Sequence, residues 1–299
     1  MNKKNKNILI AGSNGNIGSY LYNELKTKFN VSATSKSGND EQNNFNAIDF
    51  SSLESARSFA QNCKKIDVLI FLIGLAHKKG NKNDYSEFKK INFLTLKNLL
   101  DSLKINDKLP NMIIFTSTIS IYGERYKTEI YDEKLEPNPF SPYAVTKLEA
   151  ERYLLQNFKE FTWILRLAPV YSKDFMLNIN RRVKLKGFFY KAGKGNNKIS
   201  LCNINNIKKT IEEIIVGNNI DSGIYNLSDK KVYTYNYILK KMNAKYIFRV
   251  PKIFLQFIFI LGTIINNIFL KENSVKLITN NIFTSKKLGD KINLDHNFN

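Results

Sequence analysis

The chain has 299 residues, of which 43% are hydrophobic and 24% are charged. These values are normal for a folded protein, and the length suits one large domain or two that share an interface. The formal net charge is +20, but the lysines are spread along the whole chain, so we interpret it as a solvated surface and expect no nucleic acid partner. Attraction to an anionic substrate or to a membrane surface stays an alternative.

The first elements are a strand, a glycine-rich turn and a helix. An apolar strand (Ile8 to Ala11) precedes the turn, and an amphipathic helix follows it to about Lys28. Glycines in such a turn let the backbone approach a pyrophosphate closely, and the N-terminus of the helix offers N–H groups and the positive end of its dipole. The pattern predicts a dinucleotide-binding unit whose contacts come from Gly12, Asn14, Gly15, Asn16, Ile17 and Gly18.

Beyond this unit, apolar strands and helices alternate along the chain. We expect helices at 52–62 and 85–103 and one opened by Ser141-Pro142, and strands at 30–33, 67–73, 112–116 and 161–167. Alternation of this kind predicts an α/β protein with a doubly wound parallel sheet, the NAD(P)-binding Rossmann fold. After Pro169 the regularity falls, so we place this domain at 1–170 and a smaller, mostly substrate-binding domain at 171–299.

The most apolar stretch is 253–270, which Gln256, Asn266 and Asn267 interrupt. Its uninterrupted run is shorter than the roughly 20 residues that cross a bilayer. We expect one buried or subunit-interface helix here, and we keep a helix lying on a membrane and a membrane span as alternatives.

Two motifs offer groups for proton transfer. Tyr143 and Lys147 are four residues apart on the predicted helix, so their side chains share one face. An ammonium beside a phenol favours the phenolate and is expected to lower the pKa of Tyr143. Thr118 follows a predicted strand, at the end where ligands of doubly wound sheets bind, and its hydroxyl is placed to orient a reacting oxygen toward Tyr143.

The two cysteines and two histidines form no cluster with metal-ligand spacing, so we expect neither a disulfide framework nor a metal site. The N-terminus is basic and runs directly into a strand without a signal-peptide apolar region. We therefore expect a cytoplasmic protein.

Together, the motifs Gly12–Gly18, Ser117–Gly123, Tyr143–Lys147 and Leu165–Tyr171 resemble the extended short-chain dehydrogenase/reductases, in particular the sugar-nucleotide epimerase/dehydratase family. The resemblance implies an acid/base role for Tyr143, assisted by Lys147. It also implies that residues 199–228 return to the Rossmann domain, that Asn92 supports the active-site strands, and that helices at 85–103 and 143–158 form a homodimer interface. Further cofactor contacts are implied for Asp49, Phe50, Leu72, Ile73, Gly74, Thr116 and Ser117, and substrate contacts for Thr118, Lys198 and Asn203.

Two departures from the family pattern and one further resemblance refine the expectation. The dehydratase branch has an Asp-Glu pair after the active-site Thr, whereas this chain has Ile119 and Ser120, which disfavours water elimination. The second strand ends without an acidic residue and is followed by Lys36, a cation that suits the 2′-phosphate of NADPH, so NADP is favoured over NAD. The segments around Val250-Pro251 and 281–289 resemble the branch that reduces UDP-4-keto-6-deoxy-N-acetylhexosamines.

The sequence thus predicts NAD(P)H-dependent reduction of the C4 ketone of a UDP- or dTDP-linked deoxysugar, for surface polysaccharide synthesis. Two alternatives stay open: an NAD-dependent nucleotide-sugar 4-epimerase, which would use the same residues, and a cofactor-binding regulator without turnover.

Overall fold

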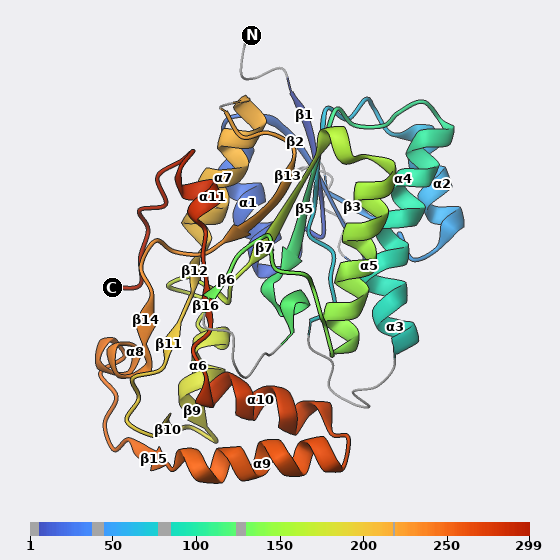
Figure 1. Ribbon diagram of the computed structural model, residues 1–299. Coiled ribbons are helices and arrows are strands. Elements are labelled where there is room, and N and C mark those ends of the chain that lie inside the picture. Colours follow the sequence, from blue (N-terminus) through green and yellow to red (C-terminus); the bar gives the residue numbers. More distant parts are fainter. Residues whose placement is uncertain (1–5, 38–44, 77–84, 124–129, 218) are drawn as a thin grey trace. The chain divides into compact units, whose positions relative to one another are not determined.

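The computed structural model describes residues 6–37, 45–76, 85–123, 130–217 and 219–299 (Figure 1). The chain divides into two compact units. Unit 1 comprises residues 1–118, 141–165 and 211–224, and unit 2 comprises residues 119–140, 166–210 and 225–299. The predicted Rossmann range 1–170 differs from unit 1 at 119–140 and 166–170, which belong to unit 2. Of the segment 199–228 that was expected to return to the Rossmann domain, 211–224 belongs to unit 1 and the rest to unit 2.

A seven-stranded sheet organises unit 1, and it confirms the predicted doubly wound parallel architecture. β1 pairs in parallel with β2 and β4, β2 with β3, and β4 with β5. The order is β13-β7-β5-β4-β1-β2-β3. Strands β2 and β3 thus lie on one side of β1, and the later strands, beginning with β4, lie on the other side. The strands are β1 (Asn7–Ala11), β2 (Asn30–Ser35), β3 (Phe45–Ala47), β4 (Val68–Phe71), β5 (Met112–Thr118), β7 (Thr162–Leu167) and β13 (Gly223–Leu227).

Helices cover both faces of this sheet because its central strands are apolar on both sides. Alternate residues such as Leu9, Leu69 and Ile113 pack with α2 (Leu53–Asn62), α4 (Thr95–Ile105) and α5 (Pro142–Asn157) in one core. α1 (Asn16–Leu25) lies on the opposite face with α7 (Ile204–Val216), as Figure 1 shows.

The predicted helix at 85–103 consists of three segments. α3 (Tyr85–Lys89) continues into a π-helical turn (Lys90–Leu94) and then into α4. π-Helical turns are rare and frequent at functional sites. This one contains Asn92, which is fully buried.

Unit 2 is built from short strands and helices around an aromatic core. A 3-10 turn (Ile119–Tyr122) follows β5, and buried Tyr171, Tyr233 and Tyr235 pack with Phe298. Its remaining elements are β6 (Ile130–Tyr131), β8 (Val170–Tyr171), α6 (Leu177–Val183), β9 (Lys184–Leu185), β10 (Phe188–Ala192), β11 (Lys198–Ile199), β12 (Cys202–Asn203), β14 (Tyr233–Thr234), α8 (Tyr235–Lys241), β15 (Phe248–Val250), α9 (Lys252–Ile264), α10 (Ile268–Ile278), β16 (Ile282–Phe283) and α11 (Lys286–Gly289).

The stretch 253–270, predicted as one buried or subunit-interface helix, forms two helices and is not buried within the chain, and its role at a subunit interface stays a prediction. The chain turns between α9 and α10, where Asn266 has a positive φ of 51° and the Asn267 side chain caps α10 by accepting from Leu270 N–H. Asparagine tolerates this left-handed conformation better than most residues. The stretch is also not buried, since Ile253 and Ile264 are each 76% exposed. Among the described residues, no helix combines the length and apolarity needed to cross a membrane.

Candidate functional site

The glycine-rich loop lies between β1 and α1, at the point where the sheet order reverses. Gly12 has φ +95°, and a Cβ there would lie 2.8 Å from the Ile73 backbone nitrogen. A Cβ on Gly18 would collide with the Gly12 carbonyl oxygen, whereas one on Gly15 would meet only that oxygen at 3.6 Å. The loop therefore packs tightly against the β4 end and stays open at Gly15.

The N-terminus of α1 is available to an anion. Gly15 is its N-cap in extended conformation, and no side chain caps it. Asn16, Ile17 and Gly18 form its first turn, whose amides have no intrahelical acceptor. The predicted residue Asn14 is exposed, and its side chain donates to the Ser37 carbonyl.

Asn92 joins three segments behind the loop. Its Oδ1 accepts from the Leu75 backbone N–H at 2.6 Å, and its Nδ2 donates to Thr146 Oγ1 at 3.1 Å and to the Leu75 carbonyl at 3.4 Å. A Cβ on Gly74 would lie 3.6 Å from Asn92 Oδ1 and 3.7 Å from Lys147 Nζ. Asn92 thus ties the segment after β4 to α5, and Gly74 keeps the space beside Lys147 clear.

Hydroxyl groups gather at the carboxyl end of β5. Thr116, Ser117 and Thr118 are buried, and Thr116 Oγ1 donates to the Phe71 carbonyl at 3.3 Å. Ser117 Oγ and, on β2, Thr34 Oγ1 are buried and have no hydrogen-bond partner among the described residues. Buried orphan hydroxyls are costly unless a ligand satisfies them. With the open glycine cradle, they fit a dinucleotide along the ends of β2, β1 and β5.

Tyr143 and Lys147 occupy neighbouring turns of α5 as predicted. The Tyr143 phenol is hydrogen-bonded to Thr118. Lys147 is 3% exposed, and its Nζ lies 4.2 Å from the centroid of the Phe115 ring. Thr118, Tyr143 and Lys147 therefore form one cluster at the end of β5.

The predicted effect on the pKa of Tyr143 is wrong in sign. Burial raises the pKa of the phenol to about 12, although the hydrogen bond with Thr118 opposes the rise. Burial likewise lowers the pKa of Lys147 to about 7, although the Glu151 carboxylate opposes this. Desolvation decides the direction of both shifts, and a half-protonated amine supports a phenolate less than a full ammonium does.

The predicted adenosine end shows an ion pair. Lys36 Nζ lies 3.0 Å from the Asp49 carboxylate, and the pKa of Asp49 is lowered by hydrogen bonds from Ser51 and Lys36, which outweigh the desolvation that raises it. The Phe50 ring is buried in the core against Phe59, and its carbonyl accepts from Asn98. Asp49 thus competes with a 2′-phosphate for Lys36, although a pair this exposed is weak.

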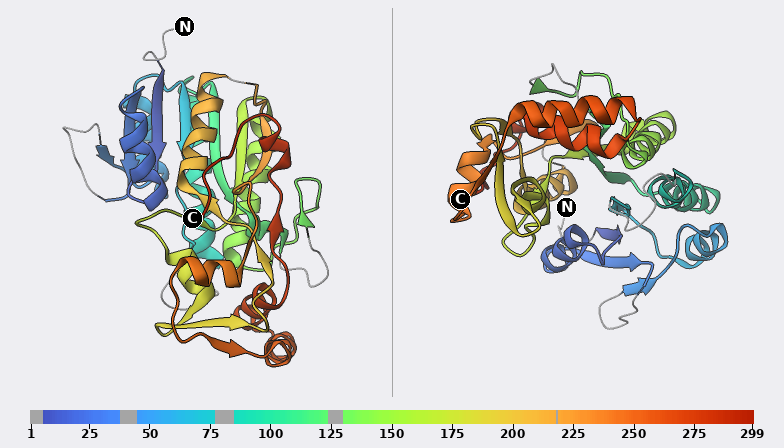
Figure 2. Two further views of the ribbon diagram at one scale, coloured as in Figure 1. Left: turned by 90° about the vertical axis from the view of Figure 1, so that its left-hand side faces the viewer. Right: turned by 90° about the horizontal axis from the view of Figure 1, so that it is seen from below.

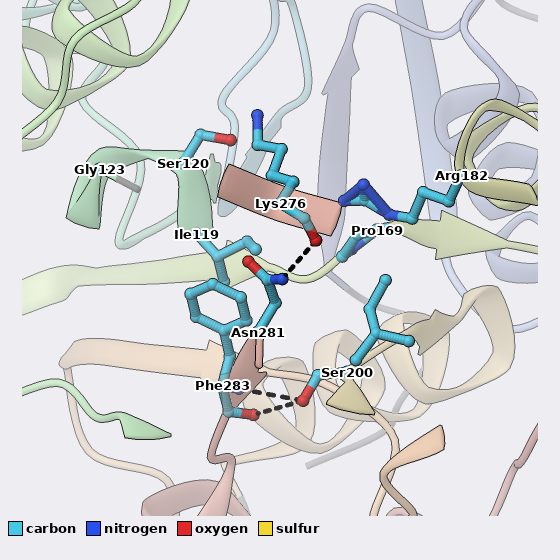
Figure 3. Close-up of a pocket in the computed structure, with 10 residues that line it drawn as sticks. Ile119, Ser120, Gly123, Pro169, Arg182, Ser200, Lys276, Asn281 and Phe283 are labelled. Carbon is cyan, nitrogen blue, oxygen red and sulfur yellow. Dashed lines mark hydrogen bonds between the residues drawn. The ribbon is translucent and has the colours of Figure 1, made fainter. Parts of the chain in front are cut away.

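Unit 2 has a small pocket, shown in Figure 3. Arg182 approaches it from α6 and Lys276 from α10, and its wall includes Ile119 and Ser120, the residues that follow Thr118 in the chain. The Arg182 Nε is buried without a partner in the described part of the chain. Lys276 Nζ also lies 3.4 Å from the Glu272 carboxylate, so Arg182 is the group at this pocket that best suits a phosphate.

The predicted substrate residues lie elsewhere in unit 2. Lys198 is exposed on β11, and Asn203 Oδ1 accepts from the Asn205 backbone N–H at 2.9 Å at the start of α7. Neither lines the pocket. Sequence reasoning missed Arg182 and Lys276, because no motif marks them and they are far apart in the chain.

The motif residues Tyr122 and Arg166 have a structural role in unit 2. Arg166 Nη1 donates to the Tyr122 hydroxyl at 2.9 Å, and that hydroxyl donates to Asn226 Oδ1 at 2.7 Å. All three side chains are buried. The network joins the 3-10 turn after β5 to the ends of β7 and β13.

Comparisons with known proteins agree on the family. The model of the NAD dependent epimerase/dehydratase family matches residues 8–210. N-acetyl-alpha-D-glucosaminyl-diphospho-ditrans,octacis-undecaprenol 4-epimerase of Escherichia coli O157:H7 is 22% identical over 264 residues, which are 85% of this chain and 76% of that protein.

Solved structures share the fold. UDP-glucose 4-epimerase of Thermotoga maritima, determined with UDP-glucose, aligns with a TM-score of 0.71 and 19% identity over 97% of this chain and 93% of that one. ADP-L-glycero-D-manno-heptose-6-epimerase of Helicobacter pylori aligns with a TM-score of 0.73 and 15% identity over 100% and 94%. The fold alone therefore accommodates different sugars.

Proposed function

This chain belongs to the NAD dependent epimerase/dehydratase family, and on that premise we propose that it is a 4-epimerase of a sugar carried on a diphosphate. The protein is an enzyme with NAD as cofactor. The observation that supports the proposal best is the cluster of Thr118, Tyr143 and Lys147 at the carboxyl end of β5.

The residues of the cluster have separate tasks. Tyr143 takes the proton of the sugar O4 hydroxyl as C4 becomes a ketone, and it returns that proton after the ketone presents its other face. Thr118 holds O4 by a hydrogen bond and points it toward the phenol. Lys147, beside Gly74, would hold the cofactor ribose, and its ammonium form would favour the phenolate that the first step needs. The chemistry that bound NAD supplies is reversible acceptance of the C4 hydride.

Elimination of water is not favoured at this site. It would need a carboxylate near C5 and C6 of the sugar, and the two residues after Thr118 are the buried Ile119 and the partly buried Ser120. Neither side chain can act as an acid or base at neutral pH. The proposal is therefore limited to oxidation and reduction at one carbon.

The Lys36–Asp49 pair favours an epimerase over a reductase. An epimerase regenerates its NAD within each turnover, so a site for the 2′-phosphate of NADPH has no use there. Asp49 occupies the cation that such a phosphate would need. This reasoning reverses the preference for NADPH that the sequence suggested.

We assign the diphosphate of the substrate to the pocket of Arg182 and Lys276. The carrier beyond the diphosphate is either a nucleotide or a polyprenol, the two carriers that the names of the similar epimerases describe for those proteins. Both carriers present the same diphosphate and sugar to the enzyme, so an experiment with each carrier is needed to distinguish them.

The test uses N-acetylglucosamine deuterated at C4, linked either to UDP or to a polyprenyl diphosphate. We expect the purified protein, without added reduced cofactor, to convert one of the two to its C4 epimer with the deuterium retained. Tyr143→Phe should abolish conversion and leave NAD binding intact, whereas Tyr246→Phe, at a side chain 88% exposed, should leave both unchanged. Conversion with loss of deuterium to water would contradict the proposal, as would full activity of Tyr143→Phe.

Reduction of a C4 ketone is the second candidate, because the pKa of Tyr143 of about 12 keeps the phenol protonated and ready to donate to a ketone oxygen. The exposed Lys36–Asp49 pair is also weak enough for a 2′-phosphate to displace Asp49. Stoichiometric loss of NADPH absorbance with a UDP-4-keto-6-deoxy-N-acetylhexosamine, and no epimerisation, would establish this function instead.

A further inference from the structure

One face of α9 is apolar and open to solvent. Exposed side chains recur at Ile253, Phe257, Ile260 and Ile264, a spacing that aligns them along one stripe of the helix. Phe254, Leu261 and Ile265 widen this stripe, and all seven side chains are exposed. We call these seven residues the apolar face of α9. A monomeric soluble protein rarely shows so large a continuous apolar patch without a partner for it.

The other side of α9 is covered by α10. Leu255 and Gly262 are buried, and a Cβ on Gly262 would lie 2.9 Å from both the Leu270 Cβ and the Lys271 backbone nitrogen. The glycine thus lets the two helices pack closely, and they run side by side in opposite directions in Figures 1 and 2. The hairpin is therefore a packed element that holds its apolar face outward.

A second group of exposed apolar side chains continues from α9 through β15. Phe248 on β15 and Phe188 on β10 are both exposed, and their rings pack edge to face with centroids 6.0 Å apart. Leu185 on β9 pairs with Phe188, and Tyr246 precedes β15. These four residues form the β10–β15 patch. Only Pro251 separates β15 from α9, so the patch and the helix belong to one region of unit 2.

The charged side chains of α9 and of the strands in this region are all positive, and the Glu272 carboxylate of α10 is paired with Lys276. Residues 175–198 contain seven Lys or Arg and no Asp or Glu, and residues 230–271 contain eight and none. Arg249 and Lys252, at the junction of β15 and α9, are exposed. Apolar side chains bordered by lysines and arginines are typical of helices that lie in the interface of an anionic membrane.

We propose that the apolar face of α9 and the β10–β15 patch dock on a bilayer that contains anionic lipids, with α9 lying along the surface. Thirteen helical residues are about 20 Å long, less than the roughly 30 Å of a hydrocarbon core. A second copy of the chain is the less suitable occupant, because a two-fold interface would set the same lysines and arginines opposite one another. The proposal is independent of the sugar chemistry.

The test is flotation of the full-length protein, without substrate, on vesicles of phosphatidylcholine alone or with phosphatidylglycerol. We expect binding to the anionic vesicles that weakens at high salt. The triple variant Ile253→Ser, Phe257→Ser, Ile264→Ser should bind at least about tenfold more weakly, a change of roughly 1.4 kcal/mol. The matched control is Leu53→Ser, Ile105→Ser, Ile130→Ser, three exposed apolar residues elsewhere, which should bind as the wild type does.

Three outcomes would overturn the proposal. The first is that the wild type binds neither vesicle but forms a dimer, and that the triple variant is a monomer, which would make a second copy of the chain the occupant of the apolar face. The second is binding to anionic vesicles that the triple variant retains in full, which would be attraction of surface lysines alone. The third is equal weakening in the control variant. Thermal unfolding and NAD binding, both measured on each variant, verify that the fold is preserved. Flotation tests membrane docking and epimerisation tests the proposed function, so failure of one proposal leaves the test of the other intact.

Discussion

Replacing Lys147 by methionine separates the chemical role of this amine from its effect on the fold. Burial lowers the pKa of Lys147 from 10.5 to about 7, and each pKa unit corresponds to about 1.4 kcal/mol. The buried amine therefore costs the folded state several kcal/mol near neutral pH, at most about 5 kcal/mol. Methionine has a similar shape and no charge. We expect Lys147→Met to abolish turnover and to raise the free energy of unfolding.

The pH dependence identifies the cause. Between pH 7 and about 10 the unfolded state holds a proton on Lys147 that the folded state has released, so the stability of the wild type rises with pH, by up to about 1.4 kcal/mol per pH unit. Below pH 7 both states are protonated and this contribution is constant. The advantage of Lys147→Met is therefore largest at pH 7 and below, and shrinks as the pH rises.

Urea unfolding followed by circular dichroism at pH 7, 8 and 9 measures this difference. Lys104→Met is the matched control, since Lys104 is exposed on α4, and it should follow the wild type at every pH. A free-energy difference between Lys147→Met and the wild type that does not change with pH would refute the reasoning, because it would mean that the amine carries its ordinary charge inside the protein.

Three further substitutions test the framework around the site. Asn92→Ala removes the bonds to Leu75 and Thr146 and should lower the free energy of unfolding by about 2–3 kcal/mol, measured by urea titration; a loss below about 0.5 kcal/mol would show that the network is dispensable. Gly18→Ala forces the loop away from the Gly12 carbonyl and should weaken NAD binding about tenfold or more in a fluorescence titration; unchanged affinity would contradict the proposed cradle. Tyr122→Phe removes the hydroxyl that joins Arg166 to Asn226. It should lower the free energy of unfolding by about 1–3 kcal/mol and with it the thermal midpoint; an unchanged midpoint would contradict the structural role of this hydroxyl.

Much of unit 1 could be predicted because its signals are local. The strands at 8–11, 67–73 and 112–116 are apolar runs, since both faces of the sheet are covered by helices. The glycines of the loop and the spacing of Tyr143 and Lys147 are set by the geometry of one turn and one helix. These patterns need no knowledge of distant segments.

The properties that escaped prediction arise from distant contacts. The spacing of Tyr143 and Lys147 predicts that they are neighbours, but it does not reveal how completely both leave water, and burial decides the direction of the pKa shift. Lys36 was interpreted as a free cation because Asp49 lies thirteen positions away, on the far side of β3. Arg182 and Lys276 meet at a pocket in a unit made of short strands, where periodicity carries little information.

The even spread of lysines concealed an uneven distribution of charge. Counting the cations suggested a uniform solvated surface, because lysines occur in every part of the chain. The asymmetry lies in the carboxylates: all 26 acidic residues are outside the segments 175–198 and 230–271, so the cations of these two segments have no acidic neighbour within their own segment. The same two segments hold the β10–β15 patch and α9. Uncompensated positive charge and exposed apolar surface thus coincide in these two segments. Either feature alone is common on protein surfaces and would not indicate a membrane.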